Sequence, residues 1–110
     1  MAGQNARTID PGDGLPLRLV GAFIRRTDLS GALLCGADLT RADLTGAVAR
    51  GADFKDAILK GTILRGTDLT DARNLTVTQL AEAIIDERTM LPDYIDRESI
   101  LRARKDLDHE

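Results

Sequence analysis

The chain has 110 residues, enough for one domain with one hydrophobic core but not for two, and 43% of them are hydrophobic. Aromatic residues make up only 3% and tryptophan is absent, which excludes an aromatic core and leaves aliphatic side chains to build it. The net charge of −3 is unevenly spread: residues 1–16 sum to −1, residues 17–76 to +2 and residues 77–110 to −4.

Residues 1–16 are expected to be a mobile lead-in to the fold. They contain three glycines, Pro11 and Pro16 among scattered polar residues, a composition typical of chain without regular structure. They lack an apolar stretch flanked by positive charge, so we expect no secretory signal. The chain has no run of eighteen apolar residues, so we expect no membrane span either.

A period of five governs residues 17–76. Apolar side chains recur at every fifth position in eleven of twelve units, without insertion or deletion, until Asn74 ends the series. Helical faces recur every 3.6 residues and strand faces every two, so this period indicates a repeat architecture instead. We expect the recurring side chains to form an interior ladder: Leu19, Ile24, Leu29, Leu34, Leu39, Leu44, Ala49, Phe54, Leu59, Leu64 and Leu69.

A second column of residues lies two positions before each member of the ladder. Eleven of its twelve members are Ala or Thr, and glycine ends seven of the twelve units. The cleanest units are Ala-Asp-Leu-Thr-Arg at 37–41 and Ala-Asp-Leu-Thr-Gly at 42–46. Small residues and glycines at fixed places favour a chain that turns sharply once in every unit.

This pattern resembles the pentapeptide-repeat family, whose motif is alanine, aspartate or asparagine, leucine and two variable residues. The resemblance covers twelve tandem units in residues 17–76. It implies an all-β solenoid, a right-handed quadrilateral β-helix of about three coils, 17–36, 37–56 and 57–76. The pattern agrees, because the sides of a square coil come close at its corners. A small side chain fits there, and the central leucine fills the interior.

Twenty-residue offsets make vertical neighbours in such a stack. The offsets place Ala49 and Phe54 in adjacent ladder columns of one coil, where we interpret them as a volume exchange. They also bring opposite charges together across neighbouring coils. The charged neighbours are Arg18 with Asp38, and Asp53 with Arg73.

Both ends of a repeat stack expose its interior unless something covers them. Residues 1–16 are too polar to cover the first coil, so a second copy of the chain is expected there, as a homodimer. Outward apolar side chains provide further surface for such contacts. The candidate interface residues are Phe23, Ile58 and Ile63.

The tail, residues 77–110, is expected to form a helical cap over the last coil. Thr76 and Gln79 have the spacing of a capping box. Apolar residues then recur at helical spacing and predict a helix over 77–87 with one apolar face. The side chains expected to pack from this capping helix onto the coil are Leu80, Ile84 and Ile85.

A second helix is predicted after Pro92. Asp93 or Asp96 can begin it, and the pattern continues to about Leu107. Its apolar positions are sparse among charges, so the sequence leaves open whether it packs on its own chain or on a partner.

No catalytic, cofactor-binding or metal-ligating constellation is predicted. The only histidine is His109, and a metal site needs several converging ligands. The only cysteine, Cys35, has no histidine within reach to act as a base; it excludes an internal disulfide and suits a reducing cytosol. The aspartates occupy the motif's own position, where carboxylates satisfy backbone groups at turns. We therefore expect a cytoplasmic protein that is no enzyme and holds no cofactor or metal.

Direct nucleic-acid binding is not expected. Arg50, Lys55, Lys60 and Arg65 lie in four successive units, so these side chains should ring the stack instead of forming one patch. Aromatic residues that could stack on bases are not interleaved with them.

Two functions remain open. The first is a non-catalytic protein–protein interaction or scaffold module with an unidentified partner. The second follows from the resemblance, because some bacterial members of the family imitate duplex DNA and bind DNA gyrase. A DNA mimic needs a long anionic face, whereas residues 17–76 sum to +2 over about three coils. The first function is therefore favoured.

Overall fold

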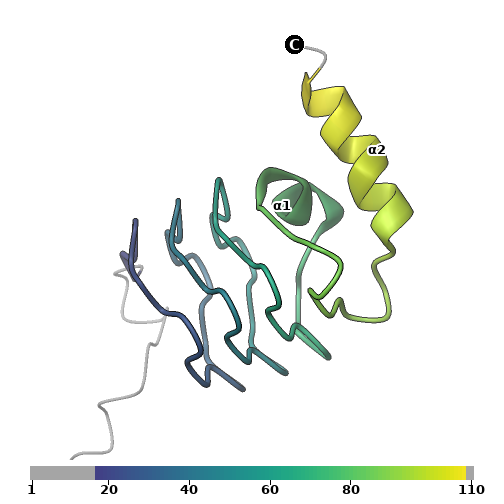
Figure 1. Ribbon diagram of the computed structural model, residues 1–110. Coiled ribbons are helices and arrows are strands. Elements are labelled where there is room, and N and C mark those ends of the chain that lie inside the picture. Colours follow the sequence, from purple (N-terminus) through teal and green to yellow (C-terminus); the bar gives the residue numbers. More distant parts are fainter. Residues whose placement is uncertain (1–16, 109–110) are drawn as a thin grey trace, which may run out of the picture.

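The computed structural model describes residues 17–108, which form a stack of coils with two helices at one end (Figure 1). The expected lead-in, residues 1–16, and His109 lie outside the described residues. Within residues 17–108, neither helix has the length and apolar character needed to cross a membrane.

The coils repeat every twenty residues. Eight parallel backbone bridges join residues twenty positions apart, from Arg18 with Asp38 to Asp53 with Arg73. Each coil therefore has four sides, and we number the sides in chain order. Each side gains one five-residue unit per coil, and the first units of sides 1 to 4 are 17–21, 22–26, 27–31 and 32–36.

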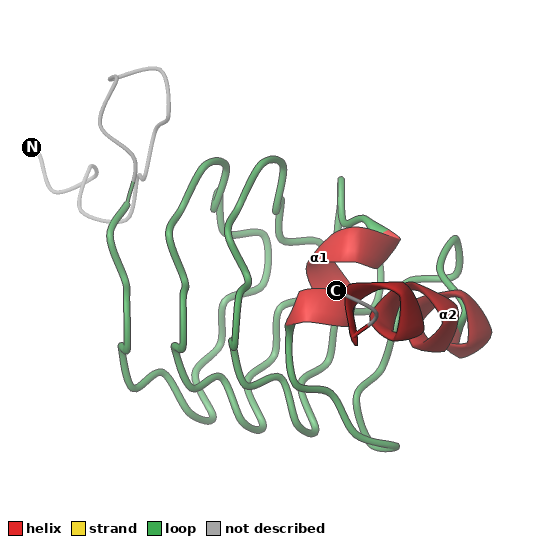
Figure 2. Cartoon of the chain, turned by 90° about the horizontal axis from the view of Figure 1, so that it is seen from above, coloured by secondary structure: helices red, strands yellow, loops and turns green. Residues whose placement is uncertain are grey.

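The bridges within residues 17–108 are isolated, so no extended strand is assigned there, and Figure 2 draws the coils as loops. This differs from the strands implied by an all-β expectation. The reason is geometric, since each five-residue unit spends part of its length on a corner. Only one residue per side is left in position to bridge to each neighbouring coil.

Backbone conformation explains the glycines at the corners. The N–H of Ala42 donates to the carbonyl of Leu39 at 2.9 Å, and Arg41 between them has a φ of 59°. A type II turn requires such a positive φ at its third residue, which glycine adopts without strain. All eleven corner residues from 21 to 71 have positive φ. Seven are glycines, and the others are Arg26, Arg41, Asp56 and Asp71.

The interior is the expected ladder and its companion column. Ladder residues from Leu34 to Leu69 are buried, as are Ala37 and the small residues that follow it in the second column. Leu19, Ile24 and Leu29 are only partly buried because they belong to the first coil, which has no described coil before it.

The ladder ends at Asn74, as the sequence indicates. Asn74 is exposed with a φ of 61°, and its Nδ2 donates to Asp53 Oδ1 at 2.8 Å. The next residue, Leu75, is buried instead.

Helix α1 comprises Val77–Glu82 and helix α2 comprises Arg97–Asp108. The capping box at Thr76 and Gln79 is present, and Leu80 is fully buried. The prediction that the first helix continues to residue 87 is wrong.

Ile84 and Ile85 lie beyond the end of α1 and are not part of a capping helix. Ile84 forms a parallel bridge with Ile63 and is exposed, whereas Ile85 is partly buried against the core. Pairing with the open edge of the third coil gives the backbone of Ile84 hydrogen-bond partners in Thr62 and Leu64 of that coil. A longer α1 would have left that edge bare, so the pairing overrides the helical pattern.

The segment after α1 forms part of a fourth coil. Ile84 bridges Ile63, twenty-one residues earlier, and Met90 bridges Asp68, twenty-two residues earlier. Residues 83–85 and 89–91 therefore occupy the small, outward and ladder positions of two further units, with α1 in place of side 1. The irregular offsets hid these units in the sequence.

Helix α2 packs on its own chain beyond α1. Ile100 is buried, and Arg104 donates to the carbonyl oxygens of Ala81 at 3.2 Å and Ala83 at 2.6 Å. Arg97 donates to the carbonyl of Asp86 at 3.0 Å and also to that of Thr89. Two arginines thus tie α2 to backbone oxygens of α1 and the fourth coil.

Candidate protein-interaction surface

The coil register divides the charged residues unequally among the four sides. Sides 1 and 2 of the three full coils carry two acidic residues, Asp38 and Asp43, against six basic ones, a balance of +4. Sides 3 and 4 carry three basic and five acidic residues, a balance of −2. The six basic residues are all exposed: Arg18, Arg25, Arg26, Arg41, Lys60 and Arg65.

The expectation that basic residues ring the stack is therefore wrong for the full set. The four residues that suggested it do lie on four different sides, Arg50 on side 3 and Lys55 on side 4 among them. Counting them alone missed the concentration on sides 1 and 2. Writing the sequence in rows of twenty would have revealed it.

Most of the large apolar side chains exposed on the coils lie on the same two sides, the exceptions being Leu33 on side 4 and Met90 on side 3. Phe23 is 75% exposed on side 2, and Ile58 is exposed on side 1. Ile63 is half-buried and shares a column with Phe23 two coils away, with Asp43 between them. We call the combined area the basic–apolar surface. It consists of the six basic residues together with Val20, Phe23, Ile58, Ile63 and Ile84.

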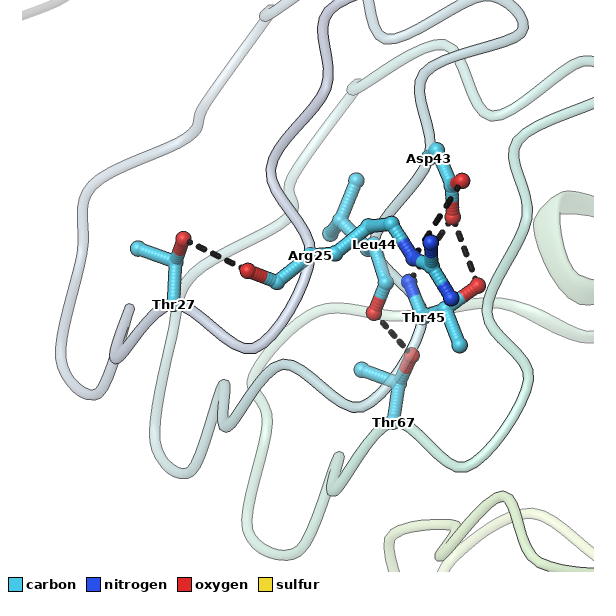
Figure 3. A network of polar contacts seen from close by, with 6 residues as sticks. All are labelled: Arg25, Thr27, Asp43, Leu44, Thr45 and Thr67. Carbon is cyan, nitrogen blue, oxygen red and sulfur yellow. Dashed lines mark hydrogen bonds and ion pairs between the residues drawn. The ribbon is translucent and has the colours of Figure 1, made fainter.

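Arg25 links the apolar and the charged parts of this surface. Its guanidinium carbon lies 5.5 Å from the centre of the Phe23 ring, within the range of a cation–π contact. Its Nε lies 3.7 Å from a carboxylate oxygen of Asp43 on the next coil, as Figure 3 shows. The exposed Phe23 ring therefore has an arginine across its face, and that arginine is oriented by Asp43.

Asp43 also stabilises the backbone beneath it. Its Oδ1 accepts from the Thr45 N–H at 3.0 Å and from the Thr45 hydroxyl at 2.6 Å (Figure 3). The Thr45 hydroxyl has the largest effect and lowers the pKa of Asp43; burial opposes it, and the Thr45 N–H and Arg25 lower the pKa further. Asp38, Asp53 and Asp68 repeat this turn bond to the residue two positions on. Each of these aspartates therefore stabilises the turn that follows it.

Two arginines of the surface lie across glycines of the next coil. A Cβ placed on Gly46 would lie 3.3 Å from Cγ of Arg26, and one on Gly61 would lie 3.1 Å from Cγ of Arg41. The glycines leave room for the arginine stems to run along the corner. The surface thus holds part of each long side chain against the coil while the charged group stays exposed.

The remaining candidates for chemistry stay apart. Burial and the neighbouring Asp53 raise the pKa of the Cys35 thiol, which disfavours the nucleophilic thiolate. Among the residues that the structure describes, no three His, Cys, Asp or Glu side chains are placed to share a metal ion.

Twenty-residue coils with a buried ladder, a small-residue column and a corner in every unit define a repeat β-helix. The family model described as pentapeptide repeats matches this chain in eight copies, over residues 18–48, 37–73 and 50–85. The chain belongs to the pentapeptide-repeat family, as its motif suggests.

Solved structures show the same likeness. The crystal structure of a pentapeptide repeat protein (Rfr23) from the cyanobacterium Cyanothece 51142 is 28% identical, with a TM-score of 0.61. The alignment covers 70% of this chain and 52% of that one, so this chain spans about half its length. The pentapeptide repeat protein alr5209 from Nostoc Pcc 7120 is also 28% identical, over 78% of this chain and 76% of that one; its TM-score of 0.36 adds no structural argument. No curated protein matches the chain.

Proposed function

We propose that this chain is a non-catalytic protein-interaction module that binds its partner through the basic–apolar surface. One observation carries the proposal: the coil register brings Phe23, Ile58 and Ile63 onto the two adjacent sides that also hold six of the nine basic residues in 17–76. Aromatic and arginine side chains are the types that dominate binding energy at protein interfaces. The backbone bridges between coils keep these side chains at fixed positions relative to one another.

The chemistry of the surface selects a partner segment with acidic and apolar residues. A balance of +4 attracts anionic groups and speeds encounter. The apolar side chains supply contact area that a phosphate backbone does not use, and Phe23 is the single aromatic residue among them. A protein partner therefore fits this surface better than a nucleic acid does.

The coils and the residues that close them support a rigid basic–apolar surface. We infer a right-handed quadrilateral β-helix of three full coils, closed at one end by residues 77–108. Gln79 Nε2 donates to the carbonyl oxygens of Phe54 at 3.0 Å and Ala57 at 2.8 Å. The Tyr94 hydroxyl donates to the carbonyl of Ala72 at 2.5 Å. The bonds to Ala57 and Ala72 satisfy oxygens of the last full coil, whose equivalents one coil earlier, Ala37 and Ala52, accept from backbone N–H groups of the third coil.

Site-specific photo-crosslinking in the native cells tests the proposal. The photoreactive residue benzoylphenylalanine replaces Phe23 or Ile58 on the surface, and Met90 on side 3 or Leu101 of α2 as matched exposed controls. We expect the same covalent partner from both surface positions and from neither control. Adding Arg25→Glu should weaken capture through Phe23. Equal capture from the controls, or none from the surface positions, would contradict the proposal.

No structural observation favours the DNA-mimic alternative. Its anionic face is missing, because the side with most acidic residues, side 3, also carries Arg50 in an ion pair with Asp68 at 3.4 Å. We expect no effect on DNA supercoiling by gyrase at micromolar protein. Inhibition that disappears when Asp38, Asp43 and Asp53 become Asn would reverse the ranking.

A further inference from the structure

The first coil lies at the end of the stack opposite the helices (Figure 1). Its side chains leave an apolar hollow at that end. The cavity has a volume of about 570 Å³. Leucine and isoleucine ladder residues of the first coil form its floor, and Leu39 of the second coil lies below them. The apolar lining includes Leu17, Leu19, Ile24, Leu29, Leu34 and Leu39.

Backbone groups around this hollow lack the partners that their equivalents have one coil later. The N–H of Asp38 donates to the carbonyl of Leu17 at 2.8 Å, and the carbonyl of Asp38 accepts from the N–H of Leu19 at 2.8 Å. Arg18 is the equivalent of Asp38 in the first coil, and within residues 17–108 neither its N–H nor its carbonyl has a backbone partner. Phe23, Asp28 and Leu33 repeat this on sides 2 to 4.

We propose that a second copy of this chain covers the hollow, giving an end-to-end dimer about a two-fold axis. Perpendicular to its 50 Å long axis, the chain measures 26 × 24 Å. Two apposed ends would bury roughly 1,200 Å² in total, the lower limit of stable protein interfaces. The helices occupy the other end, so the contact joins two identical ends and closes after two copies.

The chain's own first residues are a poorer cover. Residues 1–16 contain only three large apolar side chains, Met1, Ile9 and Leu15, for a hollow lined by seven. A second copy brings an equal set of ladder residues. It also brings a complete ring of backbone donors and acceptors.

Of the two-fold axes that run parallel to a pair of sides, charge selects one. The chain runs in opposite directions along opposite sides of a square coil, so a two-fold axis perpendicular to the stack pairs the two edges antiparallel. An axis parallel to sides 1 and 3 places side 1 over side 3 of the other copy. Arg18 then lies near Asp28 of the partner subunit, twice per dimer. The axis parallel to sides 2 and 4 would instead bring the two copies of Arg18 toward each other.

Sedimentation equilibrium and thiol cross-linking of the full-length chain test the dimer. We expect a mass of twice the 11.9 kDa of one chain. Cys35, the only cysteine, lies in the first coil, so a short bismaleimide should link two copies. The matched control, Cys35→Ser with Thr78→Cys, moves the thiol to α1 and should give no linked dimer. A monomer at all concentrations overturns the proposal, as does linkage only through the thiol at position 78.

Exchange of charges tests the orientation on exposed residues. Arg18→Asp and Asp28→Arg should each raise the dimer dissociation constant roughly tenfold, because each opposes like charges across the interface. The double variant should restore the affinity, which local damage to a turn would not do. Asp71→Arg, on side 3 of the third coil, should leave the constant unchanged. If the double variant dimerises no more tightly than the weaker of the two single variants, the pairing of Arg18 with Asp28 of the partner subunit is wrong.

Discussion

The side-chain amide of Gln79 donates to the carbonyl oxygen of Ala57 at 2.8 Å, across twenty-two residues of sequence. One coil earlier, the equivalent carbonyl of Ala37 accepts from the backbone N–H of Ile58 at 2.9 Å. Gln79 therefore replaces a backbone donor where α1 interrupts the fourth coil. Its Oε1 also accepts from the Thr76 N–H at 2.8 Å, so one side chain caps the helix and the coil.

Gln79→Glu should separate these two roles. A glutamate still accepts from Thr76 but has no N–H for the carbonyls of Phe54 and Ala57. The Phe54 carbonyl keeps the Ala57 N–H as a donor at 3.0 Å, whereas the Ala57 carbonyl loses the donor that Gln79 supplies. We expect a loss of roughly 1–3 kcal/mol in the free energy of unfolding. Urea denaturation measures it, with the exposed neighbour Thr78→Ala as control. A stable Gln79→Glu protein would show that helix capping is the only role.

Gly61→Ala and Gly51→Ala should differ in cost although their φ angles are 67° and 69°. Both variants force alanine into the left-handed region, at a cost of roughly 1–2 kcal/mol. Only position 61 adds a contact, with Cγ of Arg41 at 3.1 Å, whereas position 51 faces open space. Thermal unfolding should rank Gly61→Ala below Gly51→Ala. Arg41→Ala should remove the difference, and equal melting temperatures for the two alanine variants would contradict the packing of Arg41.

Thr89→Val should destabilise the chain more than Thr67→Val. Both hydroxyls are buried and donate to a carbonyl, that of Leu64 at 2.8 Å and that of Leu44 at 2.7 Å. The Thr89 hydroxyl also accepts from the Asp86 N–H at 3.0 Å in the irregular fourth coil. Chemical denaturation should show losses of about 1 kcal/mol at position 67 and about 2 kcal/mol at position 89. The reverse order would mean that the fourth coil contributes little stability.

Ala49 and Phe54 are both fully buried in the second coil, and their proposed volume exchange stays a prediction. Ala49→Leu should overpack and cost roughly 1–3 kcal/mol. Phe54→Leu should leave a void. If the two positions share space, the double variant should be more stable in denaturation than the sum of the single changes predicts. Additive values would place them in separate packing environments.

Acid should destabilise the fold through its turn aspartates. Asp38, Asp43, Asp53 and Asp68 each have a pKa lowered from the usual 3.8, chiefly by hydrogen bonds from neighbouring side chains. A carboxylate with a lower pKa in the folded chain stabilises it above the unfolded pKa, and that stability is lost as the pH falls through the folded pKa. The free energy of unfolding should therefore decline below about pH 4. Thr45→Val should flatten this decline, and an unchanged slope would contradict the role of its hydroxyl.

The repeat region could be predicted from sequence because each unit specifies its own local conformation. The family match over residues 18–85 confirms the resemblance, and Leu39, Ala42 and their counterparts are buried as the period of five requires. Glycines at the corners indicated the turns through backbone sterics alone. These features depend on neighbours within five residues or on a constant offset of twenty residues. They can therefore be predicted from a repeating pattern in the sequence.

The end of the stack and the interaction surface depended on tertiary structure. Residues 77–87 carry a helical pattern, yet the open edge of the third coil captures Ile84 by pairing it with Ile63. That outcome depends on which structure, helix or coil edge, offers the backbone of Ile84 its hydrogen-bond partners in the folded chain. The offsets of 21 and 22 residues at Ile84 and Met90 also depart from the constant offset of twenty, so the sequence pattern does not reveal the fourth coil. The grouping of Phe23 with Ile58 and the basic residues likewise follows from winding, because side chains far apart in sequence share a face only when the coils close.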